Sequence, residues 1–510
     1  MQTHLLLEMA ADADPDRVIV GARQGGMTLG QLLNASRRAA RWLSAQAGAS
    51  VTYAGLNEPG FAVAIFAASM AGRPFTPLNY RLPDADLRKL LARSAPTTTI
   101  CDAGMVERLS GIEGVELVSV DAFAKIYSGE DDVPPLEDRD QDVAVILFTS
   151  GTTSEPKAAI LRHGNLTSYV LSTVEFLGAD EADAALVSVP PYHIAGISAV
   201  LTSVYGGRRM VQLPAFTPEA WVETAVAERI THAMVVPTML GRILDVMSRR
   251  GLAMPDLKAL SYGGGRMPVA VVERAMDLLP DVDLVNAYGL TETSSTIAIL
   301  DPESHRAARS SSDPVVRRRL SSVGRPLPVV ELEIRDEAGV QVLAGVVGEV
   351  WVRGDQISGE YAGRKALRDD GWFPTNDAGW LDDEGYLFVE GRLDDVIVRG
   401  GENISPSEIE DVLRLHPAVR DVAVLGLPDD EWGEKIVAAV VTEGAVHADE
   451  LRALVKERLR STRVPEQVFF RTSLPYNETG KLLRRSLKSD ICSGLEAAGL
   501  DQTRTLKAAS

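Results

Sequence analysis

The sequence predicts an α/β protein of at least two domains, and three observations lead to this prediction. The chain has 510 residues, more than a single hydrophobic core usually contains. From the N-terminus to about Gly289, short apolar runs alternate with helical patterns, which is typical of parallel β–α units. After Ser322 the pattern changes to short strands of a smaller antiparallel sheet, and a compact α+β pattern follows from Asp394 to about Ser489.

Local patterns predict individual elements. Leu32–Ala45 has helical periodicity, and the apolar run AVILF at 144–148 predicts a buried strand that leads into a loop. Residues 305–319 are polar, Ser-rich and basic, so we expect a mobile loop there. In the C-terminal region we expect helices over 406–415 and 448–460. We place a domain boundary near Leu393, which gives domains of residues 1–393 and 394–491 and a tail of residues 492–510.

Composition excludes several classes of function. The formal net charge of −19 argues against nucleic acid as a partner, since phosphate backbones need clustered Lys and Arg. The two cysteines, Cys101 and Cys492, lie far apart and predict neither a disulfide framework nor a zinc site. The N-terminus resembles no signal peptide, and no apolar run reaches the roughly 20 residues that span a bilayer. We therefore expect no membrane span and a cytoplasmic location.

A run of hydroxyls, glycine and lysine follows the AVILF strand and is the sharpest local signal. Hydroxyls and exposed backbone N–H groups can donate to phosphate oxygens, and the lysine adds positive charge. A flexible Ser/Thr-rich turn has the same composition, and composition alone does not choose between the two. The candidate phosphate-binding residues are Thr149, Ser150, Gly151, Thr152, Thr153 and Lys157.

This segment resembles the TSGTTGxPKG signature of the adenylate-forming superfamily, in particular its acyl- and aryl-CoA synthetases. Ser154 and Ala158 stand where glycine is common in that family. Further segments resemble family motifs in the expected order, namely PPYHIAGI, SYGGGRMP, NAYGLTET, GWFPTNDAG, GRLDDVIVRGGENI and PYNETGKLLR. The resemblance implies a large N-terminal domain of stacked αβαβα layers with a β-barrel-like subdomain. It also implies a small α+β C-terminal domain on a hinge at Asp394.

The resemblance further implies a nucleotide site. Thr291 would contact the α-phosphate, and Glu292 would bind Mg2+. Asp377 would bind the ribose hydroxyls, and Arg392 would bind the ribose or a phosphate. Out of this context, a Glu after a Thr is most often a capping residue and a lone Asp a turn residue. The residues implied to approach the adenine and acyl groups are Gly263, Gly264, Gly265, Asn286, Ala287, Tyr288 and Gly289.

Other residues are implied to act on the acid and on the thiol. Lys481 would reach the reacting carboxylate together with the α-phosphate, although a lysine by itself is nearly always a solvated surface charge. His193 would shape or gate the carboxylate site. Gly400 and Gly401 would line the pantetheine tunnel, or alternatively form only a hairpin turn. Two departures from the family pattern are Arg266, in place of a small apolar residue, and Asn376, in place of glycine.

The implied reaction is ATP-dependent activation of a carboxylic acid to acyl-AMP, with release of pyrophosphate, followed by transfer to coenzyme A. ATP, Mg2+ and coenzyme A are the expected cofactors, and a small-molecule carboxylic acid is the expected substrate. An alternative is an adenylating enzyme that delivers its product to a carrier-protein thiol, an amine or another nucleophile. A third is a nucleotide-binding regulator without activity. The sequence leaves the identity of the acid open. It also leaves the oligomeric state open, for which a homodimer is one possibility.

Overall fold

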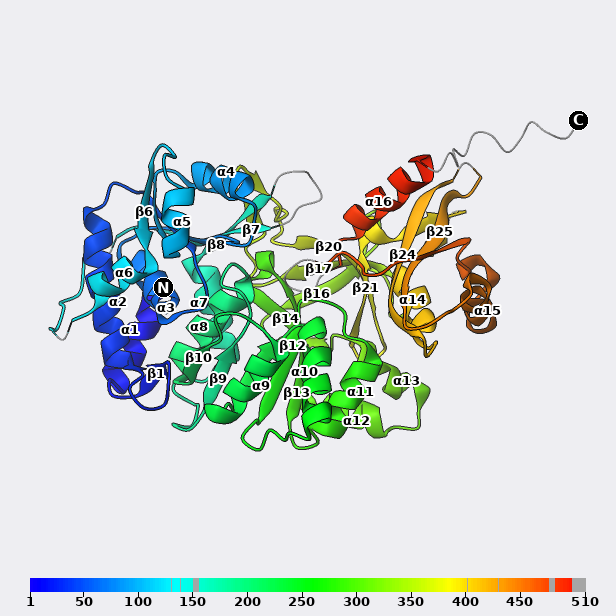
Figure 1. Cartoon of the computed structure of the whole chain (residues 1–510), viewed down its shortest axis with the longest axis horizontal. Helices are drawn as coiled ribbons and strands as arrows, with labels where there is room; N and C mark the ends of the chain where they lie inside the picture. Colours follow the sequence, from blue (N-terminus) through cyan, green and yellow to red (C-terminus); the bar gives the residue numbers. More distant parts are fainter. Residues whose placement is uncertain are drawn as a thin grey trace, which may run out of the picture. The chain divides into compact units, whose positions relative to one another are not determined.

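The structure is a computed structural model that describes residues 1–129, 131–137, 139–149, 156–400, 402–429, 431–476 and 482–497 (Figure 1). It divides into two compact units, one of Met1–Leu332 with Val352–Pro374 and one of Glu333–Trp351 with Thr375–Ser510. The predicted fold class, an α/β protein with a large N-terminal and a smaller C-terminal part, is confirmed. The domain boundary near Leu393 stays a prediction.

A nine-stranded sheet forms one layer of the larger unit. It is parallel from β13 to β1 and antiparallel at both edges. Its strands in spatial order are β15 (Arg325–Pro326), β14 (Ser295–Leu300), β13 (Asp283–Leu290), β12 (Ala259–Gly263), β11 (His232–Val235), β9 (Ala184–Val187), β10 (Arg209–Gln212), β1 (Val18–Val20) and β2 (Met27–Thr28).

An eight-stranded sheet forms the other layer. Its centre is parallel, and β7 pairs antiparallel with β8, as β8 does with β18. The predicted AVILF strand is β7. The strands in order are β19 (Arg364–Lys365), β18 (Glu360–Tyr361), β8 (Lys157–Arg162), β7 (Val143–Thr149), β4 (Phe75–Pro77), β3 (Ser50–Ala54), β5 (Thr97–Cys101) and β6 (Val115–Ser119).

Helices cover both sheets of this unit. The predicted helix at 32–45 is α2 (Leu29–Ala45), which begins at a capping box because the side chains of Thr28 and Gln31 each accept the other's backbone N–H. Every residue from Gly60 to Met70 in α3 is buried, as expected for a helix within a core that joins side chains of both sheets. The remaining helices up to residue 278 are α1 (His4–Ala13), α3 (Pro59–Met70), α4 (Asp84–Ser94), α5 (Ala103–Arg108), α6 (Val120–Tyr127), α7 (His163–Thr173), α8 (Ile194–Gly206), α9 (Pro218–Ala227), α10 (Pro237–Arg250) and α11 (Val269–Leu278).

The prediction of a loop over residues 305–319 is wrong, because most of these residues are helical. The helix α12 (Pro302–Ser310) begins where Asp301 accepts the backbone N–H of Ser304 at 2.7 Å, and α13 (Pro314–Arg318) and the 3-10 turn η2 (Arg319–Ser321) follow. The basic residues that suggested a solvated loop instead pair with acidic residues of neighbouring elements. Arg309 and Arg317 both contact Glu273 of α11.

The smaller unit contains most of a four-stranded sheet and a five-stranded sheet with helices on both faces. Alternate side chains of β24 and β25 enter two separate cores, one with α14 and α15 and one with α16. Figure 1 shows these helices beside β24 and β25. The helices predicted at 406–415 and 448–460 are α14 and α15. The elements are β16 (Glu331–Arg335), β17 (Gly348–Arg353), β20 (Phe373–Leu381), β21 (Leu387–Arg392), the 3-10 turn η3 (Leu393–Asp395), β22 (Ile397–Arg399), β23 (Glu402–Ile404), α14 (Pro406–Arg414), β24 (Val419–Asp429), β25 (Gly433–Thr442), α15 (Ala448–Arg458), the 3-10 turn η4 (Ser461–Arg463), β26 (Gln467–Phe470) and α16 (Arg484–Ala497).

The first residues of the predicted C-terminal tail are helical. The helix α16 continues past Cys492 to Ala497, and the rest of the predicted tail lies outside the described residues. Among the helices of the described ranges, none is long and apolar enough to cross a bilayer.

Candidate active site

The glycine turn of SYGGGRMP lies at the carboxyl end of β12, where open α/β sheets bind their ligands. Gly263 pairs with Ala287 of β13, and a Cβ atom added to Gly263 would lie 2.2 Å from the Ala287 carbonyl oxygen. Gly264 has a φ of 77° and follows directly. The turn and the Asn286–Ala287 segment are therefore neighbours, and glycine is required at the point of closest approach. Arg266, at the end of this turn, is exposed.

A buried pair supports this turn from within. The Tyr262 hydroxyl lies 2.7 Å from His305 Nε2, and His305 Nδ1 lies 2.8 Å from the Asp301 carbonyl oxygen. Because Nδ1 faces an acceptor, it carries the proton and Nε2 accepts from the tyrosine. Burial lowers the pKa of His305 and raises the pKa of Tyr262, so both groups stay neutral.

The Tyr288–Glu292 segment crosses a bulge and enters a tight turn. The pairing of β13 with β14 shifts between Tyr288 and Gly289, and the 3-10 turn η1 (Thr291–Thr293) follows. Ser294 and Ser295 then have φ angles of 55° and 114°, which are unfavourable for residues other than glycine. Strain of this kind is often found at functional sites, and no sequence motif indicated either serine.

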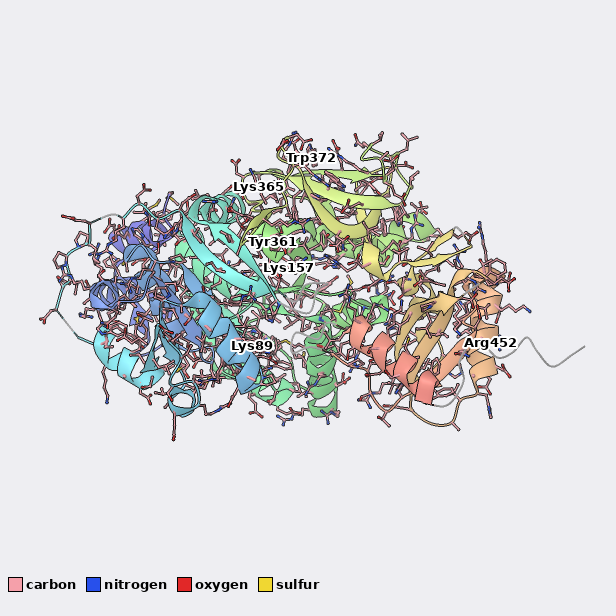
Figure 2. The ribbon with its side chains drawn as sticks, turned by 90° about the horizontal axis from the view of Figure 1, so that it is seen from above. Lys89, Lys157, Tyr361, Lys365, Trp372 and Arg452 are labelled. Carbon is pink, nitrogen blue, oxygen red and sulfur yellow. The ribbon has the colours of Figure 1, made fainter. Side chains whose placement is uncertain are left out.

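Glu292 and Lys157 are connected through Tyr361, a residue that lies in none of the sequence motifs. The Tyr361 hydroxyl donates to Glu292 Oε1 at 2.5 Å, and Lys157 Nζ lies 5.7 Å from the centroid of the Tyr361 ring. Figure 2 labels Lys157 and Tyr361 close together. All three side chains are partly exposed. The structure thus gathers a carboxylate and a lysine, both predicted to bind the metal–nucleotide complex, around one phenol.

The stems of the predicted phosphate loop are well defined. Thr149 ends β7 and pairs with Lys157 at the start of β8, and the Thr149 hydroxyl donates to the Lys157 carbonyl at 3.4 Å. Arg93 of α4 donates to the Pro156 carbonyl at 3.0 Å and lies over the Phe148 ring. Ala158, which stands where glycine is common in the family pattern, is buried in β8 opposite Phe148. The strand therefore accommodates its methyl group.

His193 occupies the N-cap position of α8 and has extended backbone angles. Its ring lies 4.6 Å from the ring of Tyr192, which in turn meets Tyr80 edge-on at 5.7 Å. The histidine therefore belongs to an aromatic cluster at the start of a helix. A role toward the acid remains a prediction.

In the smaller unit, the two predicted ribose residues meet. Asp377 pairs with Arg392 across β20 and β21, and Arg392 Nη1 donates to Asp377 Oδ1 at 3.1 Å. Asn376, which stands where glycine is usual in the family pattern, has a φ of 61°, in the left-handed region that asparagine tolerates better than most residues. Its side chain donates to Asp394 Oδ2 at 3.3 Å.

Gly400 follows β22, which pairs with β23 in an antiparallel hairpin. Its φ of 57° requires a residue that tolerates the left-handed region, and an added Cβ atom would lie 3.0 Å from the Trp432 ring. The hairpin alternative for this position therefore agrees with the structure, and it does not exclude the tunnel. The other predicted residues, Ser150, Gly151, Thr152, Thr153, Gly401 and Lys481, lie outside the described residues.

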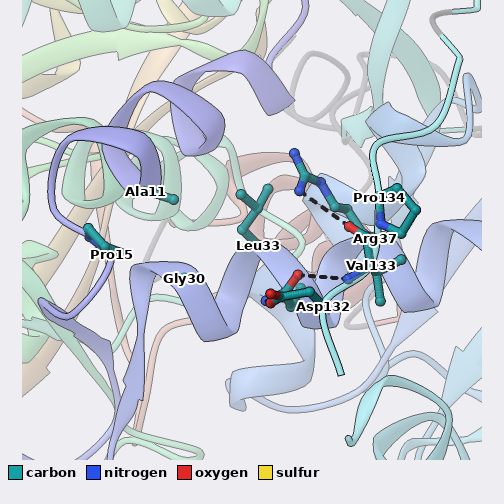
Figure 3. Close-up of a pocket in the computed structure, with 9 residues that line it drawn as sticks. Ala11, Pro15, Gly30, Leu33, Arg37, Asp132, Val133 and Pro134 are labelled. Carbon is teal, nitrogen blue, oxygen red and sulfur yellow. Dashed lines mark hydrogen bonds between the residues drawn. The ribbon is translucent and has the colours of Figure 1, made fainter. Parts of the chain in front are cut away.

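A metal site made of protein side chains alone is not found in the described ranges, where no three His, Cys, Asp or Glu side chains could hold an ion together. A metal that arrives with a nucleotide needs only one or two carboxylates, because phosphates and water complete its coordination. Glu292 fits that requirement. A surface pocket of about 450 Å³ between α1, α2 and residues 132–134 involves none of the predicted site residues (Figure 3).

Comparison with known proteins bears on the whole chain. Residues 7–362 match the family of AMP-binding enzymes, and residues 408–481 match the AMP-binding enzyme C-terminal domain. The chain is 33% identical over 479 residues to a feruloyl-CoA synthase from an Amycolatopsis species, covering 91% of this chain and 94% of that protein.

Two solved structures extend the comparison. One is o-succinylbenzoate coenzyme A synthetase from Bacillus subtilis in complex with ATP and magnesium ion, at a TM-score of 0.82 and 29% identity over 95% of this chain and 99% of that one. The other is an amide bond synthetase from Marinactinospora thermotolerans, at a TM-score of 0.85 and 27% identity over 96% and 99%. The resemblance inferred from the motifs is thereby confirmed, and the chain belongs to the family of AMP-binding, adenylate-forming enzymes.

Proposed function

We propose that this chain is an AMP-forming ligase that joins a carboxylic acid to coenzyme A through an acyl-adenylate. The observation that carries the proposal is the Lys157–Tyr361–Glu292 cluster, because it offers a cation for phosphate and a carboxylate for a metal in one place. Family membership agrees with the predicted enzyme class and with ATP, Mg2+ and coenzyme A as cofactors.

In the first half-reaction, a carboxylate oxygen of the acid forms a bond to the α-phosphorus of ATP, and the bond to pyrophosphate breaks. Lys157 and Lys481 would offset the negative charge of the two reacting anions, and Thr291 would donate to the α-phosphate. Mg2+, held by Glu292, would supply further positive charge when bound. At about 4 Å and an effective dielectric near 20, one unit charge contributes roughly 4 kcal/mol.

In the second half-reaction, a thiol attacks the acyl carbonyl and AMP leaves. We propose that Asp377 and Arg392 hold the ribose and that Asp394 is the hinge about which residues 394–491 rotate. The rotation would withdraw Lys481 and bring Gly400 and Gly401 to the thiol. His193 would stay with the acid, and Gly263–Gly265 and Tyr288 with the acyl and adenine groups.

The acyl acceptor distinguishes two candidate functions. Relatives named as CoA synthase or CoA ligase, of which one is 33% identical, favour coenzyme A. The amide bond synthetase at a TM-score of 0.85 favours an amine acceptor as the second candidate. An aromatic acid is the first substrate class to try, since relatives are named for feruloyl, 2-succinylbenzoate and indoleacetate substrates.

A pyrophosphate-release screen tests the proposal. Short, medium, long-chain and aromatic acids are offered with ATP and Mg2+, in the presence of coenzyme A, of an amine, or of neither. We expect sustained AMP formation only with one class of acid and with coenzyme A. Turnover with the amine instead would favour the second candidate, and no acid-dependent pyrophosphate release from any acid would contradict both.

Two further proposals concern the cell. We propose a cytoplasmic location, and a homodimer as the oligomeric state. Cell fractionation tests the first, and light scattering during size-exclusion chromatography tests the second.

A further inference from the structure

We infer that Tyr361 is a positioning residue that orients the Glu292 carboxylate toward the metal–nucleotide complex. The inference rests on the proposed function, since it assigns the metal to Glu292. Tyr361 lies on the short strand β18, some seventy residues from Glu292 in sequence, which is why motif spacing did not reveal it.

The contact between the two side chains is a short hydrogen bond. The phenol donates to Glu292 Oε1 at 2.5 Å, and both residues are partly buried. A hydrogen bond to an ionised oxygen is stronger than one between neutral groups. With one oxygen held, the plane of the carboxylate is set, and so is the direction of the second oxygen.

Main-chain hydrogen bonds connect the segment around Tyr361 both to Glu292 and to β8. The amides of Ser358 and Gly359 donate to the Glu292 carbonyl oxygen at 2.9 and 3.2 Å, and Tyr361 itself pairs with Ala159 of β8. The segment 358–361 therefore connects the η1 turn to the strand that begins at Lys157. Motion of the phenol relative to the carboxylate is restricted by main-chain bonds as well as by its own hydroxyl.

The phenol suits this position better than a second charged group would. The face of its ring attracts the Lys157 ammonium, 5.7 Å from the centroid, while its hydroxyl binds the carboxylate. Because the phenol is neutral, it orients Glu292 without neutralising the charge that a metal requires. A lysine or arginine at the same place would compete with the metal for that charge.

The test measures metal binding and does not depend on turnover. Calorimetric titration of Mg2+ into the ATP-saturated protein, without acid and corrected by the same titration into ATP alone, gives the dissociation constant of the metal for wild type, Tyr361→Phe, Glu292→Gln and the double variant. Tyr53→Phe is the matched control, because it removes another hydroxyl, one that donates to the Leu56 carbonyl at 2.9 Å. Affinity for AMP without metal and the unliganded melting temperature are measured alongside.

We expect Tyr361→Phe to weaken Mg2+ binding about tenfold, the effect of losing one hydrogen bond to a charged group. AMP affinity and the Tyr53→Phe control should change by less than about twofold. In the Glu292→Gln background the same substitution should have little further effect, because the hydroxyl acts through the carboxylate. Tyr361→Met, which also lacks the hydroxyl but is more flexible, repeats the measurement if the phenylalanine variant melts early.

Unchanged Mg2+ affinity in Tyr361→Phe, or an undiminished effect in the Glu292→Gln background, would overturn the inference alone. A wild-type protein that binds no ATP in the presence of Mg2+ would overturn the proposed function and this inference with it.

Discussion

Gly289 illustrates how single positions constrain this site. A Cβ atom added there would lie 1.8 Å from the Ser295 carbonyl oxygen, so the bulge between β13 and β14 closes only around glycine. Gly265 is different, since an added Cβ would lie 3.7 Å from the nearest atom, in the Pro237 ring. The two glycines look equivalent in the motifs, and only the neighbouring strand distinguishes them.

We expect Gly289→Ala to destabilise the protein by about 1–3 kcal/mol, because the neighbouring backbone must move apart. Gly265→Ala, the matched control, should change the free energy of unfolding by less than about 0.5 kcal/mol. Urea unfolding followed by circular dichroism measures both. Equal midpoints for the two variants would contradict the steric argument.

At the scale of elements, the junction of α7 with α1 contains a buried histidine. The backbone N–H of Thr3 donates to His163 Nδ1 at 3.1 Å, and His163 is 4% exposed. Burial, with a smaller contribution from nearby His4, lowers the pKa of His163 from 6.5 to about 4. The neutral ring thus connects the start of α7 to the N-terminal helix.

This junction should lose stability in mild acid. Below pH 6.5 the unfolded chain binds a proton at His163 that the folded chain excludes down to about pH 4. The contribution of neutral His163 to the free energy of unfolding is therefore complete above pH 6.5 and is lost as the pH falls from 6.5 to about 4. It amounts to about 3 kcal/mol.

The measurement is the midpoint of urea unfolding between about pH 4 and 8. His163→Asn should show a shallower fall than wild type, and comparison at the alkaline end separates the loss of packing from the effect of protonation. Parallel curves for the two proteins would contradict the assignment.

The helices α12 and α13 show why element prediction failed where it did. Residues 305–319 carry a strongly polar composition, and such a segment is a loop unless neighbours bind its charges. Here Glu273 of α11 accepts both Arg309 and Arg317, and His305 is buried against Tyr262. Glu273 lies more than thirty residues before Arg309 in the sequence, so a local sequence pattern cannot indicate that the two residues pair.

At the scale of the whole molecule, the proposed reaction divides between two half-reactions that use different residues. We expect Lys481→Ala to slow acyl-AMP formation by about 10²–10³-fold, the loss of one well-placed charge. It should largely spare thioester formation from supplied acyl-AMP.

Lys488→Ala is the matched control, because this lysine of α16 lies in the same unit and pairs with Glu434 at 3.2 Å. Pyrophosphate exchange measures the first half-reaction, and release of AMP from synthetic acyl-AMP with coenzyme A measures the second. Equal losses in both half-reactions would count against the division.

The sequence by itself determined the family, the fold class and the identities of the candidate site residues. Strands such as β7 and helices such as α2 were predictable because their apolar period and caps are local properties of the chain. The motif residues were recognisable because a resemblance compares residue types in order and needs no distances.

Only the tertiary structure decided which other residues contact and support the motif residues. Tyr361 beside Glu292 and His305 beside Tyr262 are contacts between segments 69 and 43 residues apart. Likewise, Asn376 departs from glycine in the sequence, and only the structure shows that its backbone is left-handed, a conformation that glycine and asparagine tolerate. The physical reason is that hydrogen bonds and steric limits act between atoms that folding brings together, and spacing along the chain carries no record of them.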